Sequence, residues 1–142
     1  MRAKLARWNN ASTSFTSCGR VAHQPGATHN LPHGVCNAIL LPYVEEFNLI
    51  GNLNRFRDLA EAMGEKIDGL STGDAAAKAI QAIRTISRQV GIPSDLKQLG
   101  VKPEDFEIMA ENAMKDVCCL TNPRKATKEQ IIEIYRRAYE GE

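Results

Sequence analysis

Residues 31–42 read LPHGVCNAILLP, and within this stretch the chain changes from polar to strongly apolar. The block from Ala38 to Leu41 would be apolar on every side of a helix, which predicts a buried helix over residues 35–48. Pro42 has no N–H to contribute to a helix, so we expect it to kink or restart this helix. The rest of the chain must then pack around this buried element.

The sequence before residue 33 has a different composition. Residues 9–33 are rich in Ser, Thr, Asn, Gly and Pro, with only scattered apolar positions. These residue types favour turns, and Gly and Thr disfavour helices, so this stretch is predicted to be a loop. We therefore expect an irregular or partly helical N-terminal segment over residues 1–33 and a helical domain over residues 34–142.

Beyond residue 48, apolar residues recur at steps of three and four, and strand-like alternation is absent. The spacing predicts a helix over residues 53–63, with Gly64 as its left-handed C-terminal cap. A second helix is predicted to begin at Ser71 or Thr72 and to end before Gly91. Its apolar stripe consists of Ala76, Ala79, Ile80, Ile83, Ile86 and Val90.

The C-terminal third predicts one short helical turn and two further helices. Residues 94–99 are predicted to form the turn, which ends at Gly100. Pro103 is predicted to be the first residue of the next helix, a position where the backbone N–H has no partner within the helix, so its absence costs nothing. The inner face of that helix is Phe106, Met109, Ala110, Ala113 and Val117. Thr127 and Gln130 then have the spacing of a capping box. The last stripe is Ile131, Ile132, Tyr135, Ala138 and Tyr139. The predicted fold class is an all-α helical bundle.

Composition limits the partners and the compartment. The 142 residues carry 18 Lys and Arg against 17 Asp and Glu, so no basic excess is present to bind nucleic acid. No apolar run is long enough to span a membrane, and residues 1–8 lack the apolar centre of a secretory signal, so we expect a cytoplasmic protein. The cysteines show no Cys-x-x-Cys spacing, which favours free thiols. They are Cys18, Cys36, Cys118 and Cys119.

All three histidines, His23, His29 and His33, lie within eleven residues. Imidazole is a common transition-metal ligand and transfers protons near neutral pH, so this cluster is the candidate functional site. One interpretation is a makeshift metal site built from all three rings, and the other is that His33 simply caps the helix that follows. Pro32 favours a turn between His29 and His33, so their spacing of four does not place them on one helix face. No Gly-x-Gly-x-x-Gly motif marks a dinucleotide site.

Several segments together resemble the iron-containing alcohol dehydrogenases, a metal-dependent family. They are HQ at 23–24, NLPHGVCNAILLP at 30–42, FRDLA at 56–60, AMG at 62–64, VGIP at 90–93, DVC at 116–118 and NP at 122–123. The resemblance reaches the C-terminus and covers the final third of the family's length. It implies the C-terminal, all-helical, metal-carrying domain of a two-domain oxidoreductase. Such an enzyme moves hydride between an alcohol or aldehyde and NAD(P).

The resemblance also implies roles for three residues. His33 corresponds to a ligand of Fe²⁺ or Zn²⁺, which in the family acts as a Lewis acid on the substrate oxygen. His23 corresponds to a catalytic histidine beside the nicotinamide, associated with proton transfer, and Cys118 to a cysteine near the substrate pocket. Gly19 stands where the family has another metal-binding histidine. The other two ligands, an aspartate and a histidine, belong to the part of the family that precedes this segment.

These departures imply a truncated chain that is inactive alone and binds metal and NAD(P) weakly or not at all. We expect it to form a homo-oligomer or to combine with a separate nucleotide-binding chain. The alternative is a non-catalytic helical interaction or structural module. Such a module would self-associate through the former domain interface, because exposed apolar surface tends to be covered by association.

Overall fold

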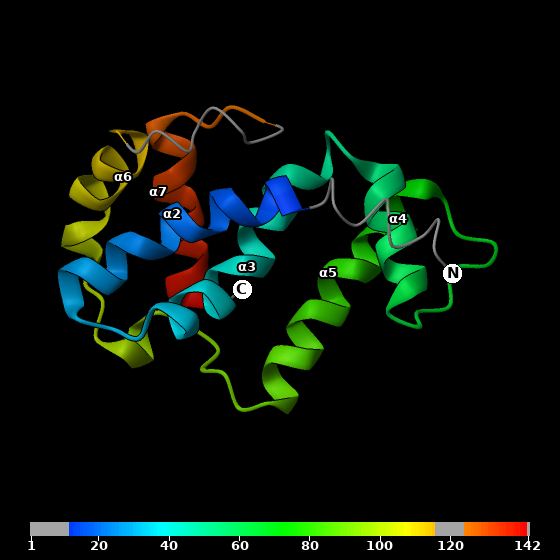
Figure 1. The fold of residues 1–142 in the computed structure, drawn as a ribbon, viewed down its shortest axis with the longest axis horizontal. Coiled ribbons are helices and arrows are strands. Elements are labelled where there is room, and N and C mark those ends of the chain that lie inside the picture. Colours follow the sequence, from blue (N-terminus) through cyan, green and yellow to red (C-terminus); the bar gives the residue numbers. More distant parts are fainter. Residues whose placement is uncertain (1–11, 116–123, 142) are drawn as a thin grey trace.

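The computed structural model describes residues 12–115 and 124–141, with side chains from residue 21 on, and these ranges contain helices and no strand (Figure 1). The predicted all-α fold class is therefore confirmed. The helices are α2 (Ser12–His29), α3 (His33–Leu49), α4 (Leu53–Ala62), α5 (Thr72–Gln89), α6 (Phe106–Lys115) and α7 (Lys128–Glu140). Two short 3-10 turns, η1 (Lys97–Leu99) and η2 (Pro103–Asp105), lie between α5 and α6. None of the described helices combines the length and apolarity needed to cross a bilayer.

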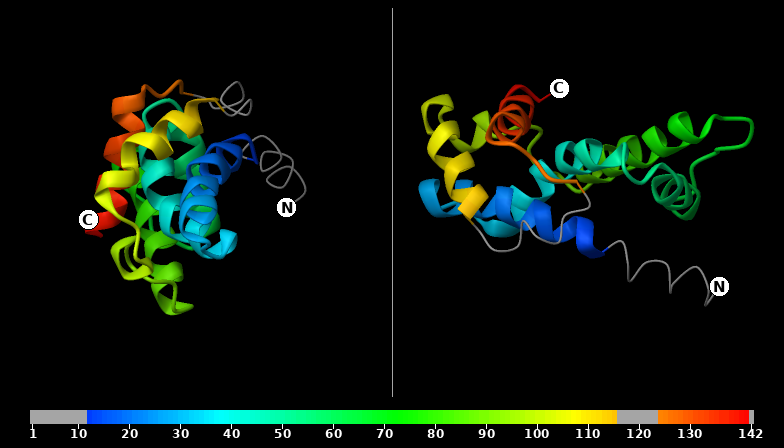
Figure 2. Two further views of the ribbon diagram at one scale, coloured as in Figure 1. Left: turned by 90° about the vertical axis from the view of Figure 1, so that its left-hand side faces the viewer. Right: turned by 90° about the horizontal axis from the view of Figure 1, so that it is seen from above.

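Helix α3 occupies the centre, as the apolar block predicts. It packs against α2, α5 and α7, and Leu40 on it is completely buried. The main core gathers side chains from α2, α3, α6, α7 and the 96–101 segment, whereas a smaller core joins α4 to α5. Figure 2 shows the α4–α5 pair projecting from the rest of the bundle. Pro42 lies inside α3, which runs as one helix from His33 to Leu49 instead of restarting.

The loop predicted over residues 9–33 is wrong for Ser12–His29, which form α2. This helix contains Gly19 and Pro25, both of which have poor helix propensity. Its second half nevertheless contributes Val21 and Ala22 to the main core, and Pro25 is fully buried. Tertiary packing therefore outweighs the local preference. The predicted turn between His29 and His33 is present, with Asn30 in the left-handed region at φ 52°.

Most of the predicted helix ends are confirmed. Ser71 is the N-cap of α5 and accepts a hydrogen bond from the Asp74 backbone N–H. Gly64 and Gly100 have φ of 87° and 78°, the left-handed conformation that favours glycine at a helix end. The apolar stripe of α5 is only partly core, because Ile86 and Val90 are 49% and 69% exposed.

The capping box of α7 supports a direct stability test. The Thr127 hydroxyl accepts from the Gln130 N–H, and the Gln130 side chain accepts from the Thr127 N–H. Thr127→Ala is expected to lower the free energy of unfolding by about 1 kcal/mol, measured by urea denaturation. Thr85→Ala, at an exposed position within α5, is the control and is expected to change stability much less. Equal losses in the two variants would contradict a capping role.

Candidate functional site

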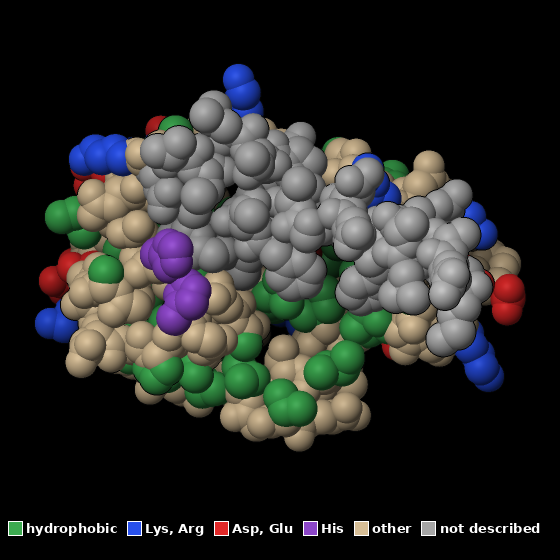
Figure 3. All heavy atoms as spheres, in the orientation of Figure 1, with side chains coloured by type: hydrophobic (Ala, Val, Ile, Leu, Met, Phe, Trp, Pro, Cys, Tyr) green, Lys and Arg blue, Asp and Glu red, His purple; other side chains and the backbone are tan. Residues whose placement is uncertain are grey.

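The turn between α2 and α3 brings two of the three histidines together. His23 lies on α2 and His33 begins α3. Their rings stack with centroids 4.6 Å apart and planes 29° from parallel. Both side chains are exposed, and histidine atoms are visible at the surface of the molecule in Figure 3. The two helices therefore present a pair of imidazoles on an accessible face of the bundle.

Asn37 holds His33 from one turn further along α3. Its Nδ2 lies 2.8 Å from Nε2 of His33 and donates to it. An amide N–H can only donate, so in this contact Nε2 of His33 is the acceptor. This contact fixes the orientation of the His33 ring. The sequence carried a signal for it, because positions four apart share one face of a helix.

His29 is directed elsewhere. Its Nε2 lies 3.1 Å from Oδ2 of Asp105, in the turn that precedes α6. Its Nδ1 is buried and has no hydrogen-bond partner among the described residues. His29 therefore connects the end of α2 to the start of α6. The makeshift site of three histidines is wrong, because only His23 and His33 meet.

The described residues do not fit a complete metal site. Nowhere in residues 12–115 and 124–141 do three or more His, Cys, Asp or Glu side chains converge. Nε2 of His33 accepts from Asn37, so a metal at this nitrogen would have to displace the amide. Gly19, one turn before His23 on α2, has no side chain to offer. A catalytic metal site in a protein ordinarily uses about three side-chain ligands. Within the described ranges, His33 therefore has no two further His, Cys, Asp or Glu side chains beside it to complete such a site.

The predicted substrate residue Cys118, together with Cys119, lies outside the described residues. Cys36 can be placed on α3, where it is completely buried. Burial raises the pKa of its thiol above the usual value. A buried thiol with a raised pKa is a poor nucleophile, which agrees with the interpretation of Cys36 as a free core cysteine.

Two buried polar residues were not anticipated from the sequence. Glu45 and Asn48 lie three residues apart on α3 and are 4% and 0% exposed. Glu45 Oε1 and both amide atoms of Asn48 have no hydrogen-bond partner among the described residues. Burial raises the pKa of Glu45 to about 7. No sequence motif marks them, because their burial depends on how the other elements pack on α3.

Comparison with known proteins identifies the family. The model of the Fe-containing alcohol dehydrogenase family, C-terminal, matches residues 3–139. The chain is 50% identical over 132 residues to 1,3-propanediol dehydrogenase of Citrobacter freundii, covering 93% of this chain and 34% of that protein. It is 45% identical to the NAD-dependent methanol dehydrogenase of Bacillus methanolicus, covering 83% of this chain and 31% of the relative. The solved structure of a 1,3-propanediol oxidoreductase superposes with a TM-score of 0.85 at 51% identity, over 87% of this chain and 32% of that one.

The chain therefore belongs to the Fe-containing alcohol dehydrogenase family and corresponds to the C-terminal helical domain of its members. It spans about a third of the length of the relatives that it matches. The resemblance inferred from residues 23–42 and the later motifs is confirmed, and so is the oxidoreductase family to which they point.

Proposed function

We propose that this chain contributes the helical half of an NAD(P)-dependent alcohol dehydrogenase site that acts on a short primary alcohol or aldehyde. The observation that supports this most directly is the stacking of His23 and His33 on an exposed face, in a chain that belongs to this family. An exposed pair of imidazoles can be covered by another domain or chain. That domain or chain would supply the NAD(P) cofactor and the other metal ligands.

Within this proposal the two histidines have different tasks. His33 would exchange its contact with Asn37 for the family's metal ion and serve as one of its ligands, and the bound metal would polarise the substrate oxygen. His23, stacked 4.6 Å away, would exchange a proton with the alcohol or aldehyde, for which imidazole is suited near neutral pH. Cys118 would lie near the substrate. Alone, the chain is expected to be inactive and to bind metal and NAD(P) weakly or not at all.

The test is complementation. The purified chain, given Fe²⁺ or Zn²⁺, NADH and short aldehydes, is expected to show no turnover. Adding the N-terminal two thirds of the Citrobacter 1,3-propanediol dehydrogenase is expected to produce NADH oxidation. In that complex His23→Ala should lower kcat by about 10²–10⁴-fold, the usual contribution of a proton-transferring side chain.

Two further variants separate a site residue from a structural one. His33→Ala should abolish turnover and metal retention in the complex. His29→Ala should leave both in place, because His29 faces Asp105 and not the other histidines. Turnover by the chain alone would contradict the need for another domain or chain. Equal activity of the His33 and His29 variants would contradict the metal role of His33.

A non-catalytic interaction module is the second candidate, favoured by large hydrophobic side chains left exposed on several helices. Ile50, Val90 and Ile108 are 72%, 69% and 55% exposed. We propose that such a module would form a homo-oligomer or bind a separate nucleotide-binding chain. Analytical ultracentrifugation decides this point, since a monomer at all concentrations would contradict self-association.

A further inference from the structure

The connection between α4 and α5 contains a turn with the sequence Asp68-Gly69. The Leu70 N–H donates to the Ile67 carbonyl at 3.2 Å, which closes the turn around these two residues. Both are exposed, and Gly69 has a φ of 77°, in the left-handed region. A Cβ built on Gly69 would meet no atom within 4 Å. The surrounding chain therefore leaves the peptide bond between Asp68 and Gly69 accessible.

No described residue holds either polar group of this pair by a hydrogen bond. The Gly69 N–H donates to no acceptor, and the Asp68 carboxyl accepts from no donor, within residues 12–115 and 124–141. Glycine has no side chain to shield its nitrogen, and it allows backbone rotations that bring this nitrogen against the preceding carboxyl. The Gly69 nitrogen and the Asp68 carboxyl carbon can therefore approach each other and close a five-membered ring.

The other described aspartates are each followed by a nitrogen that donates to a backbone carbonyl. The pairs are Asp58–Leu59 inside α4, Asp74–Ala75 in the first turn of α5, Asp95–Leu96 and Asp105–Phe106. Asp74 is the best comparison, because it is exposed and Ala75 is nearly as small as glycine. The Ala75 N–H nevertheless donates to the Ser71 carbonyl at 2.9 Å. An amide nitrogen must give up such a bond before it can react, which costs free energy.

From this arrangement we infer that Asp68 is a site of non-enzymatic modification, at which the folded chain converts aspartate to isoaspartate. The Gly69 nitrogen bonds to the Asp68 side-chain carboxyl carbon. The bond from this carbon to its hydroxyl oxygen breaks, and the hydroxyl leaves with the amide proton as water. Water then adds to the main-chain carbonyl of the resulting succinimide and breaks its bond to nitrogen. The peptide link now runs through the side-chain carboxyl carbon, with no oxidant or cofactor consumed.

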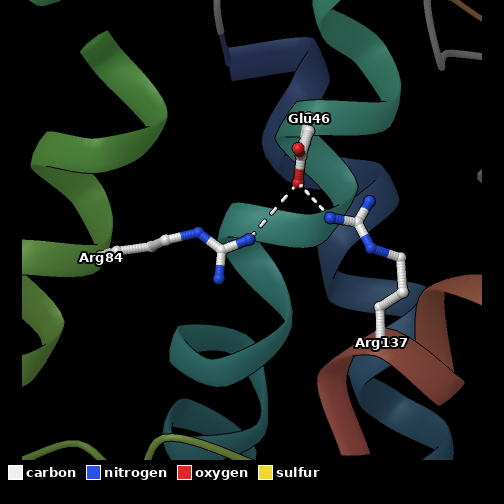
Figure 4. A network of polar contacts seen from close by, with 3 residues as sticks. All are labelled: Glu46, Arg84 and Arg137. Carbon is white, nitrogen blue, oxygen red and sulfur yellow. Dashed lines mark hydrogen bonds and ion pairs between the residues drawn. The ribbon is translucent and has the colours of Figure 1, made fainter. Parts of the chain in front are cut away.

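The modification adds one methylene group to the main chain of the turn, and the rest of the bundle does not depend on that turn. The buried residues that join α4 to α5 all lie on the two helices. Further along α5, Arg84 donates to Glu46 of α3 at 3.3 Å, and Arg137 of α7 donates to the same oxygen at 3.0 Å (Figure 4). Isoaspartate is therefore expected to accumulate in a chain that stays folded. The inference does not depend on the proposed dehydrogenase function.

The experiment incubates the full chain at neutral pH and physiological temperature. Isoaspartate is measured by peptide mapping with mass spectrometry and by methylation with an L-isoaspartyl O-methyltransferase and S-adenosylmethionine. It should form about tenfold or more faster at Asp68 than at Asp74, because Gly69 leaves its nitrogen unshielded and unbonded. Asp68→Glu should remove most of the signal, since the charge is kept but ring closure would need six members. Asp74→Glu is the matched control and should leave the total isoaspartate unchanged.

Incubation in concentrated urea separates the effect of the fold from that of the sequence. Unfolding should speed the reaction at Asp74 severalfold, because the Ala75 N–H is released, and should change the rate at Asp68 little. Equal rates at Asp68 and Asp74 in the folded chain, or equal yields from the two Glu variants, would overturn the site. A rate at Asp68 that rises on unfolding as much as the rate at Asp74 would overturn the role of the folded turn.

Discussion

Replacing Glu45 by Gln is expected to raise the free energy of unfolding by about 3 kcal/mol at about pH 8. Glu45 is 4% exposed, and burial raises its pKa from 4.5 to about 7. Each unit of pKa difference between the folded and unfolded chain corresponds to about 1.4 kcal/mol. Because Gln is uncharged at every pH and close to Glu in shape, the variant removes the cost of burying an anion and keeps the packing.

The direction in which the free energy of unfolding changes with pH depends on whether the folded or the unfolded chain binds the Glu45 proton more tightly. With a folded pKa of about 7 and an unfolded value near 4.5, the folded chain binds the proton more tightly between these values. The stability of the wild-type chain therefore falls as pH rises from about 4.5 to about 7, and this contribution is level above that range. At pH 4.5 the Gln variant should differ from wild type by well under about 1 kcal/mol.

Urea denaturation of both proteins at these two pH values measures the effect. Glu46→Gln is the neighbouring control, because Glu46 accepts from two guanidinium groups and should lose stability at pH 8 instead of gaining it. A Glu45→Gln variant whose advantage is the same at both pH values would show that ionisation of this carboxyl is not the cause.

Sequence patterns predicted those parts of the fold that are decided within a few residues. The capping box at Thr127, the N-cap at Ser71 and the left-handed glycine at Gly64 each depend on local hydrogen bonds or backbone sterics. The burial of α3 followed from its apolar block. The exposed end of the α5 stripe was mispredicted, because periodicity identifies an apolar face but not whether another element covers it.

The candidate site was predictable only in part. The clustering of His23 and His33 in sequence marked the region, and the family resemblance assigned each a role. Their ring stacking required α2 to be a helix that returns against α3, which residue types alone argued against. The pairing of His29 with Asp105 joins positions 76 residues apart, so no local pattern contains it. The unpartnered Glu45 and Asn48 likewise depend on tertiary packing.

The failure of the loop prediction for α2 leads to the second large expected effect, at Tyr135. Pro25 has no N–H, so the Val21 carbonyl four residues earlier lacks its usual helical partner. The Tyr135 hydroxyl on α7 donates to this carbonyl at 2.8 Å, within the core. The Tyr135 ring is completely buried and lies 6.0 Å from that of Phe106. One side chain thus supplies both the packing and the hydrogen bond that α2 needs.

Tyr135→Ala is expected to lower the free energy of unfolding by about 3–5 kcal/mol, as for other large aromatic side chains removed from a core. Tyr135→Phe should cost about 1–2 kcal/mol, because it leaves the buried Val21 carbonyl unpaired. Tyr139→Phe is the matched control, since Tyr139 lies on the same helix, packs edge-on against Phe106 and is only partly buried. The Tyr139→Phe variant should have nearly the same free energy of unfolding as the wild type, measured by urea denaturation.

A double-mutant cycle isolates the hydrogen bond. Pro25→Ala restores an N–H at position 25, which can then donate to the Val21 carbonyl within α2. In that background Tyr135→Phe should cost much less than in the wild type, because the carbonyl is already paired. An unchanged cost would mean that the hydroxyl stabilises the core by some other contact. A reduced cost would show that α2, which contains proline and glycine, is a helix because a residue 114 positions away completes its hydrogen bonding.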